Sequence, residues 1–370
     1  MPKTPTPRRA PAQPAPHSAK LDLDLLRALS NAAGVSGDEG AVRKLVLEAI
    51  GPHVDEARVD ALGNVLAVKH AARGRGRPRL LLAAHMDEVG LMVVDHDTDG
   101  SLRFEVVGGI SERVLLGKSV VVGARRLPGV IGAAPVHLLG GERLEAVVRP
   151  AQMHIDVGAA NQEAARRLAP LGDRATFATE FAVLDGAVRG KALDDRLGCA
   201  TLIGLLRGGP YPVELHAAFT VQEEVGLRGA RVAGYAVEPQ AAIALDCAPA
   251  NDLPDSRGRE NTQYNARLGQ GPVIYLADGR TISDSRLVEF VRRTAEGAGV
   301  PYQIRQPGGG GTDAGALQQT RQGVPVVSIS TPARYIHGPA ALARIEDWQN
   351  TLRLLELVLG QFEARLVKKT

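Results

Sequence analysis

The 370-residue sequence has few of the features that mark secreted, membrane or disulfide-stapled proteins. It contains only two cysteines, Cys199 and Cys247, which are far apart, so neither a disulfide framework nor a cysteine zinc knot is supported. Aromatic residues make up 4% of the chain. No apolar run approaches the roughly 18 residues that a membrane helix needs. We therefore expect a reduced, cytoplasmic location and no membrane partner.

The sequence also lacks a strong charge of either sign. The net charge is +3, and residues 1–20 contribute four bases and no acid, so the rest of the chain is close to neutral. Arginines are scattered among acids without a basic stripe, and we expect no nucleic-acid partner. Residues 1–20 contain six prolines and no apolar segment. This composition predicts a disordered, proline-rich tail and argues against a secretory signal.

The remaining chain has the alternating texture of an α/β protein. Residues 21–50 predict two amphipathic helices, with Ser36 to Glu39 at the start of the second. Residues 57–70 predict a hairpin that turns at Gly63, and the apolar run after Pro78 predicts a buried central strand. Residues 95–184 consist of short β-like segments punctuated by glycine and proline.

The predicted fold class is α/β, with a mixed sheet flanked by helices in a three-layer sandwich and an inserted small β-barrel. The catalytic domain is expected at residues 21–94 and 185–370, and the inserted barrel at 95–184.

Residues that could carry chemistry lie at the ends of several predicted strands. Each has an ordinary structural explanation on its own, such as a surface acid, a loop histidine or a helix cap. The set consists of His85 with Asp87, Glu223 with Glu224, Asp246, His337, and the pair Asp194 and Asp195 before a predicted helix.

Taken together, these residues point to metal chemistry. A sheet brings its strand ends to one rim, and ligands bind at the carboxyl ends of strands in open α/β sheets. Two histidines with several carboxylates are the ligands expected for a two-metal hydrolytic site with zinc, cobalt or manganese. Such a site needs one shared carboxylate, and a further uncoordinated carboxylate as general base. The HExxH and GxSxG motifs of other hydrolases are absent.

Six segments in order along the chain resemble motifs of the glutamyl aminopeptidase and tetrahedral (TET) aminopeptidase family of dinuclear zinc metallopeptidases. These segments are AAHMDEVGLMV, GKALDDRLGC, VQEEVGLRGA, ALDCAPANDLPD, GGGGTDAGALQ and TPARYIHGPA. The resemblance extends from about residue 21 to residue 367. Segments such as GGISERVLLGKSVVV and HIDVGA resemble the inserted β-barrel of the family, through which its members dimerise.

The resemblance implies a role for each candidate. His85, Asp194 and Asp246 would bind one metal, and Asp194, Glu224 and His337 the other, with Asp194 as the shared bridge. Glu223 would be the general base and acid, and Asp87 would orient His85. Asp195 is left with a structural role such as helix capping or pairing with Arg196. The glycine loop 308–311, with Thr312 and Asp313, matches a family segment close to the site but receives no role. Cys247 follows a ligand position, where inert packing is favoured.

The expected function is that of a metal-dependent aminopeptidase that removes N-terminal residues from short peptides, with two divalent ions per subunit, zinc foremost and cobalt or manganese as alternatives. The resemblance implies a homo-oligomer, either a dimer through the barrel or a tetrahedral dodecamer. An N-acyl-amino-acid deacylase or a dipeptidase would use the same centre. A glycosidase is disfavoured by the scarcity of aromatics, and a non-catalytic shell-forming scaffold by the presence of every expected site residue.

Overall fold

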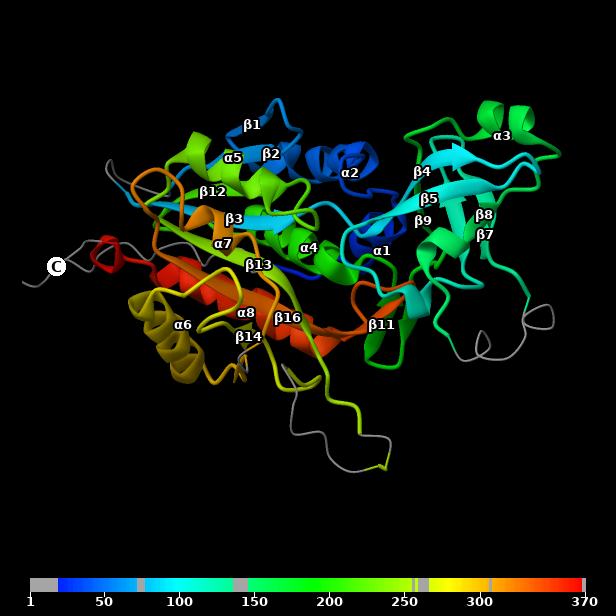
Figure 1. Cartoon of the computed structure of the whole chain (residues 1–370). Helices are drawn as coiled ribbons and strands as arrows, with labels where there is room; N and C mark the ends of the chain where they lie inside the picture. The colour runs from blue at the N-terminus through cyan, green and yellow to red at the C-terminus, as the bar shows by residue number, and fades with distance from the viewer. Residues whose placement is uncertain are drawn as a thin grey trace, which may run out of the picture.

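The structure is a computed structural model that describes residues 19–71, 77–135, 146–254, 257–258, 266–305 and 308–367. The proline-rich tail predicted at residues 1–20 therefore lies, except for its last two residues, outside the described part. The described chain forms a large helix-covered sheet and a separate small barrel, which Figure 1 shows at opposite sides of the molecule. None of the helices in the described ranges is long and apolar enough to cross a membrane.

The large sheet is mixed and has eleven strands, nine of them in the order β1-β2-β12-β3-β13-β16-β17-β11-β10. The four central strands are β12 (Glu214–Thr220), β3 (Arg79–His85), β13 (Ala241–Pro249) and β16 (Val326–Arg334), and they are parallel. The outer strands are β1 (Glu56–Val59), β2 (Val65–Lys69), β10 (Ala182–Leu184), β11 (Ala187–Gly190) and β17 (Ala341–Arg344). The short strands β14 (Val273–Ile274) and β15 (Gln303–Ile304) join at β16.

Helices cover both faces of this sheet. One layer contains α1 (Leu23–Asn31), α2 (Gly40–Ile50), α4 (Leu193–Arg207), α6 (Ser285–Ala298) and α8 (Ile345–Gln361). The other layer contains α5 (Arg228–Val237) and α7 (Ala314–Leu317). The result is a three-layer sandwich, as predicted.

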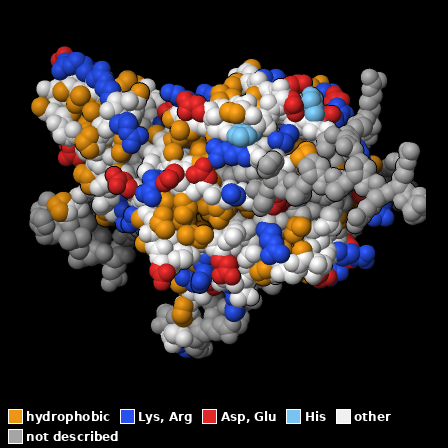
Figure 2. All heavy atoms as spheres, turned by 180° about the vertical axis from the view of Figure 1, so that it is seen from behind, with side chains coloured by type: hydrophobic (Ala, Val, Ile, Leu, Met, Phe, Trp, Pro, Cys, Tyr) orange, Lys and Arg blue, Asp and Glu red, His pale blue; other side chains and the backbone are white. Residues whose placement is uncertain are grey.

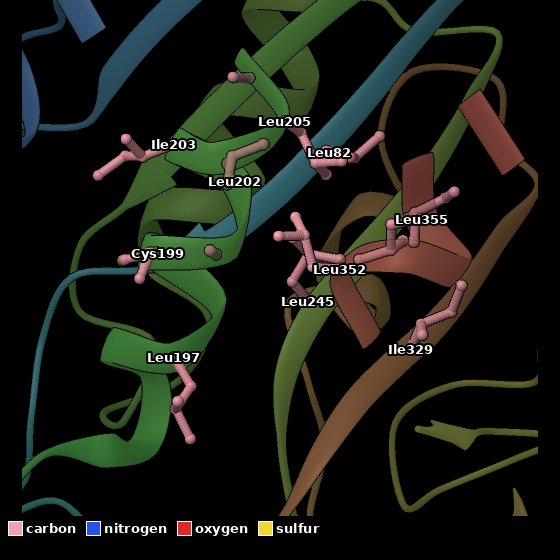
Figure 3. Close-up of a cluster of buried hydrophobic side chains, with 14 of the residues drawn as sticks. Leu82, Leu197, Cys199, Leu202, Ile203, Leu205, Leu245, Ile329, Leu352 and Leu355 are labelled. Carbon is pink, nitrogen blue, oxygen red and sulfur yellow. The ribbon is translucent and has the colours of Figure 1, made fainter. Parts of the chain in front are cut away.

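Strand β3 shows why the apolar run after Pro78 is continuous. Its side chains alternate between the two faces of the sheet, so Leu80 and Leu82 pack in the larger core while Leu81 and Ala83 pack in the smaller one. All four are fully buried. Both faces are covered, and a buried parallel strand of this kind has no polar side. Figure 3 shows the larger core, where Leu82, Leu245 and Ile329 of neighbouring strands lie in one cluster with Leu202 of α4 and Leu352 of α8.

The barrel is closed and contains six strands, in the order β4-β5-β8-β7-β6-β9. Its strands are β4 (Gly90–His96), β5 (Leu102–Val107), β6 (Ser119–Val122), β7 (Leu127–Gly132), β8 (His154–Asp156) and β9 (Arg174–Phe177), and α3 (Gln162–Leu168) packs beside them. Its separate core includes Leu102, Val120 and Ile155. The fold class predicted from the sequence, including the inserted barrel, is confirmed.

Two local features differ from the sequence predictions. The barrel strands run from Gly90 to Phe177 rather than 95–184, because only four residues separate β3 from β4 and the first barrel strand therefore begins before residue 95. Strand β10 pairs with β11 in the large sheet. Helix α2 begins at Gly40 with Glu39 as its N-cap and no side-chain cap. Ser36, expected at this helix start, instead donates to Asp87.

Candidate metal centre

Four neighbouring parallel strands deliver most of the candidate residues to one edge of the large sheet. His85 is the last residue of β3, and Glu223 and Glu224 follow β12. Asp246 lies in β13, and His337 follows β16. The β3 and β13 pairing ends at Ala83 and Ala244, so the two strands are no longer hydrogen-bonded where His85 and Asp246 project. This is the strand edge at which open α/β sheets bind ligands.

Asp194 completes the centre from the first turn of α4, and its two carboxylate oxygens face different histidines. Its Oδ1 lies 3.2 Å from His85 Nε2, and its Oδ2 lies 3.4 Å from His337 Nε2. His85 Nε2 is also 4.0 Å from Asp246 Oδ1, and His337 Nε2 is 3.3 Å from Glu224 Oε2. The side chains thus form two groups that share Asp194.

Asp87 connects several parts of the centre from behind. It is fully buried, and its Oδ1 lies 3.5 Å from His85 Nδ1. The same carboxylate accepts hydrogen bonds from the backbone amides of Glu223 (2.9 Å) and Glu224 (3.1 Å), and from Ser36 Oγ (2.6 Å). Asp87 therefore holds the ring of His85 through its backbone carbonyl oxygen, 3.1 Å from Nδ1, and holds the backbone of both glutamates through its carboxylate.

The barrel also takes part in the centre. His337 Nδ1 lies 3.1 Å from the carbonyl oxygen of Gly109, in the segment after β5. A proton on Nδ1 donated to this carbonyl leaves Nε2 free to face Asp194 and Glu224. Ring nitrogens of metal-binding histidines are commonly oriented in this way by a carbonyl or carboxylate on the opposite side of the ring.

Glu223 presents its carboxylate to a cavity of about 700 Å³ beside the two groups. The chain turns after β12 at Gln222, whose φ of 55° lies in the left-handed region. This turn lets both adjacent glutamates reach the centre, although neighbouring side chains on an extended strand would face opposite sides. The cavity is lined by six of the seven predicted site residues, namely His85, Asp194, Glu223, Glu224, Asp246 and His337. Asp87 lies behind them.

The electrostatics of the centre show an excess of buried negative charge. Burial, together with nearby carboxylates, raises the pKa of Glu223 and Asp246 well above the usual range and that of Glu224 to about 7. Burial opposes the charge on His337, but its hydrogen bond to Asp194 and the charge of Glu224 outweigh this and raise its pKa to about 9. The two histidines lower the pKa of Asp194 against the effect of burial.

These observations fit a site for divalent cations. Carboxylate and imidazole ligands suit zinc and manganese, and the excess acidic groups need positive charge that the two histidines alone do not supply. Ligand atoms of His85, Asp194 and Glu224 all lie within 4.8 Å of one another. Within the described ranges, no lysine or arginine forms an ion pair with the carboxylates that line the cavity.

A second buried group, Asp194 with Asp195 and Cys247, has a structural explanation. Asp195 accepts hydrogen bonds from the amides of Gly198 (2.9 Å) and His85 (3.3 Å), so it caps the helix and ties it to β3. The Cys247 thiol donates to the carbonyl of Leu193, and burial raises its pKa well above the usual range. A protonated, buried thiol of this kind is inert.

Sequence reasoning missed several residues that support the centre. Ser36 and Gly109 act on Asp87 and His337 as described above, and only the tertiary fold brings them there. Asp313 also supports the centre: it is 2% exposed and accepts a 2.5 Å hydrogen bond from Thr220 Oγ1. Burial raises its pKa to about 6, and its charge in turn raises the pKa of Glu223. The GGGGTDAG motif was the available signal for it.

Residues 63–354 match the M42 glutamyl aminopeptidase family. A putative aminopeptidase of Acetivibrio thermocellus is 37% identical, with 90% of this chain and 97% of that protein covered. The lysyl aminopeptidase of Pyrococcus furiosus and the glutamyl aminopeptidase of Lactococcus lactis subsp. cremoris are each 33% identical, with 93% of this chain and 98% of each relative covered.

Solved structures show the same architecture. A TET aminopeptidase from the marine sediment archaeon Thaumarchaeota archaeon SCGC AB-539-E09 has a TM-score of 0.88 and 35% identity, with 93% of this chain and 98% of that chain covered. The TET1 peptidase of Pyrococcus horikoshii, which assembles into a tetrahedron or a large octahedral shell, has a TM-score of 0.80 and 34% identity, with 92% and 99% covered.

Proposed function

The chain belongs to the M42 glutamyl aminopeptidase family, and from this membership and the geometry of the centre we propose how it acts as a metal-dependent aminopeptidase. The single observation that carries the proposal is the position of the Asp194 carboxylate, because one of its oxygens faces His85 and the other faces His337. A carboxylate placed in this way suits the shared ligand of a two-metal hydrolase. Asp246 beside His85 and Glu224 beside His337 give each ion a further carboxylate.

We propose that the two ions are divalent, with zinc favoured and cobalt or manganese as alternatives. When bound, they would supply Lewis acidity toward the carbonyl group of the scissile peptide bond and toward the attacking water. The residues of the chain do the rest. The carbonyl oxygen of Asp87, 3.1 Å from His85 Nδ1, holds the ring of His85, and the carbonyl of Gly109 holds the ring of His337 in the same way.

Glu223 is proposed as the general base and acid. Its carboxylate faces the cavity, and no ion pair to it from a lysine or arginine is found within the described ranges. Burial raises its pKa toward the range in which a carboxylate can accept a proton from water and later return it to a departing amine. The Asp87 carboxylate accepts a hydrogen bond from the backbone amide of Glu223. This bond fixes the backbone of Glu223 and so the direction of the Glu223 carboxylate.

The substrates are proposed to be short peptides with a free amino terminus. The alternative chemistries of the same centre, N-acyl-amino-acid deacylase and dipeptidase, differ in the substrate end that they recognise. A glycosidase is not favoured, because the carboxylates that line the cavity are gathered around two histidines rather than standing as an isolated pair across a sugar bond.

Location and assembly are proposals of the same kind. Both cysteines are buried and free, which fits the reducing cytoplasm. We propose a homo-oligomer that contacts through the barrel, either a dimer or a dodecamer. The barrel domain exposes apolar side chains, including Leu116 (45%), Val130 (44%) and Leu171 (63%), and Figure 2 shows orange side chains on this lobe. Light scattering would measure the mass, and a monomer would contradict the proposal.

The test of the function is hydrolysis of free and N-acetylated aminoacyl anilides before and after chelation and metal return. We expect cleavage of the free-amine set only, lost on chelation, restored by zinc or cobalt, and reduced by at least about a hundredfold in Glu223→Gln. Release of acetate from the acetylated set would indicate a deacylase, and inactivity with every metal would contradict an enzymatic function.

A further inference from the structure

Tyr275 is a residue of the cavity that the chemistry proposed above does not use. It lines the cavity together with His85, Glu223 and Asp246, and only 3% of its surface is exposed. It directly follows the short strand β14, which joins the large sheet at β16. A phenol buried beside a group of carboxylates calls for an explanation, because an apolar side chain would fill the space without the cost of burying a polar group.

The strand register places Tyr275 on the same face of the sheet as Asp246. Val273 of β14 pairs with Ser330 of β16, and Ser330 pairs with Asp246 of β13, so these three side chains share one face. Tyr275 lies two residues after Val273 and therefore continues this face. The residue between them, Ile274, packs in the larger core on the opposite face. The ring of Tyr275 thus stands on the side of the sheet that carries the metal centre.

The ring is held in place by Arg305. The guanidinium carbon of Arg305 lies 4.6 Å from the ring centre, a cation–π contact, and Arg305 is 6% exposed. Arg305 is itself held by two loops, because its Nη2 donates to the carbonyl of Gly309 at 2.7 Å and its Nη1 to that of Ala277 at 3.4 Å. The ring also belongs to a small buried cluster with Ala248 of β13. These contacts leave the hydroxyl little freedom to change its position.

The hydroxyl of Tyr275 donates no hydrogen bond to a protein acceptor within the described ranges. Buried tyrosines usually have such a partner, as Tyr211 does in donating to the carbonyl of Leu205 at 3.0 Å. Ser330 is not the acceptor, because its Oγ is buried without a hydrogen-bond partner in the described structure. Burial and the negative charge of Asp246 raise the pKa of Tyr275, so the phenol keeps its proton. A buried O–H donor without an acceptor therefore lies beside the metal centre.

We propose that Tyr275 is a catalytic residue whose hydroxyl donates a hydrogen bond to the oxygen of the scissile carbonyl while that oxygen carries negative charge. The inference rests on the proposed aminopeptidase function. As water attacks, a C–O bond forms, Glu223 takes a proton from the water, and the electron pair of the C=O double bond moves onto the carbonyl oxygen. When that pair returns, the C–N bond breaks and Glu223 gives its proton to the departing amine. Tyr275 keeps its own proton throughout.

A fixed donor in a buried cavity acts mainly on the transition state. The neutral carbonyl of the bound substrate accepts a weaker hydrogen bond than the charged oxygen does, and a donor that is already in place needs no reorganisation when the charge develops. Loss of the hydroxyl should therefore lower kcat and leave KM nearly unchanged. The ions proposed for the centre would share the charge, so the loss should be smaller than for a sole oxyanion donor.

Tyr275→Phe tests this directly, because it removes one oxygen and keeps the ring against Arg305. With the aminoacyl anilide that the metal-loaded wild-type enzyme cleaves best, we expect kcat to fall by about ten- to a hundredfold and KM to stay within about twofold. Tyr211→Phe is the matched control, because it removes a hydroxyl from another buried tyrosine that does not line the cavity. It should leave kcat and KM unchanged. Both variants should hold as much metal as the wild-type protein.

Inhibitor binding gives a second readout that does not depend on turnover. The phosphonate analogue of leucine presents tetrahedral, negatively charged oxygens to the centre and so resembles the transition state. Isopentylamine has the amino group and side chain of leucine but no oxygen. In calorimetry with the metal-loaded protein, Tyr275→Phe should weaken the phosphonate by about tenfold or more and leave the amine unchanged.

Arg305 is expected to act through the ring, as a positioning residue. Arg305→Gln should lower kcat by about two- to tenfold, the equivalent of one cation–π contact, and should have little further effect in a protein that already carries Tyr275→Phe. A merely structural role for Arg305 would lower kcat equally in both backgrounds. If Tyr275→Phe does not fold, Arg305→Gln is measured alone, and an unchanged affinity for the phosphonate would then overturn the proposal.

The proposal is also overturned if Tyr275→Phe keeps the wild-type kcat, loses metal together with activity, or weakens the phosphonate and the amine equally. A raised KM with an unchanged kcat would do the same, because the hydroxyl would then hold the substrate's amino group. Absence of any hydrolysis by the wild-type protein would instead contradict the proposed aminopeptidase function, and the inference with it.

Discussion

Replacing Glu88 by glutamine should destabilise the protein more than any single exposed charge removal. The side chain of Glu88 is 3% exposed and accepts hydrogen bonds from Lys191 Nζ at 2.8 and 3.0 Å, and Arg196 Nη2 lies 3.6 Å from it. Its carboxylate also accepts the amide of Gly34 and, from the barrel, the hydroxyl of Thr176. One carboxylate therefore neutralises two buried cations and links the two domains.

The magnitude follows from what remains after the change. Lys191 can lose its proton, but the guanidinium of Arg196 cannot, and that side chain is 0% exposed. Breaking a buried pair so that one charge is left alone costs about 3–5 kcal/mol. At about 2.1 cal/mol/K per residue, the unfolding entropy of a chain of this length is about 0.8 kcal/mol/K, so the melting temperature should fall by about 4–6 °C.

Thermal unfolding by circular dichroism and calorimetry would measure this, with Glu48→Gln as the control. Glu48 pairs with Lys44 at 3.9 Å on the surface, where both side chains are mostly exposed, and its loss should cost less than about 0.5 kcal/mol. The reasoning would be refuted if Glu88→Gln and Glu48→Gln lowered the melting temperature equally.

Three further predictions concern the same framework. Burial lowers the pKa of Lys191 to about 8, so the folded state binds fewer protons than the unfolded state between about pH 8 and 10.5. As the pH rises across that range, the free energy of unfolding of the wild-type protein relative to Lys191→Met should therefore rise by about 3 kcal/mol. Urea titrations would measure this difference, and a difference that does not change with pH would contradict the argument. Gly90→Ala should lower the free energy of unfolding by about 1–3 kcal/mol, because a Cβ there would lie 2.4 Å from Val35 Cγ2. Gly297→Ala, in α6, should raise it by up to about 1 kcal/mol, because a Cβ there would meet no atom within 4 Å. Equal melting temperatures of the two variants would refute the argument. Chelation should lower the free energy of unfolding by about 2.7 kcal/mol for each ion held at a hundredfold excess over its Kd, and with it the melting temperature; the drop should be smaller in Asp246→Asn.

The sequence predicted the parts of the centre that depend on strand ends. His85, Asp246 and His337 each accompany an apolar strand, and a parallel sheet necessarily gathers such ends at one edge. The continuous apolar run of β3 likewise identified a central strand, because both faces of the sheet are covered. Both features could be predicted because each depends only on a short stretch of sequence: the residues that end a strand, and the apolar run that forms it.

The features that the sequence did not predict depend on where loops meet. No sequence pattern near Gly109, in the segment after β5, indicates that its carbonyl contacts His337. No pattern near Ser36 indicates that its hydroxyl donates a hydrogen bond to Asp87 instead of capping a helix. Arg305 also gave no signal, since it is one of many scattered arginines and only its burial against Tyr275 distinguishes it. Such contacts join segments that lie far apart in the sequence, and only the tertiary fold brings them together.

The most direct test of the account is the number of metal ions held per subunit, measured by elemental analysis after unbound metal is removed. We predict about two ions in the wild-type protein, and about one each in Asp246→Asn and His337→Ala, which each remove a ligand from one group only. Asp194→Asn should weaken binding of both, because its two oxygens serve the two groups separately. A wild-type protein that holds a single ion, or an Asp194→Asn variant that retains two, would contradict the shared-carboxylate centre.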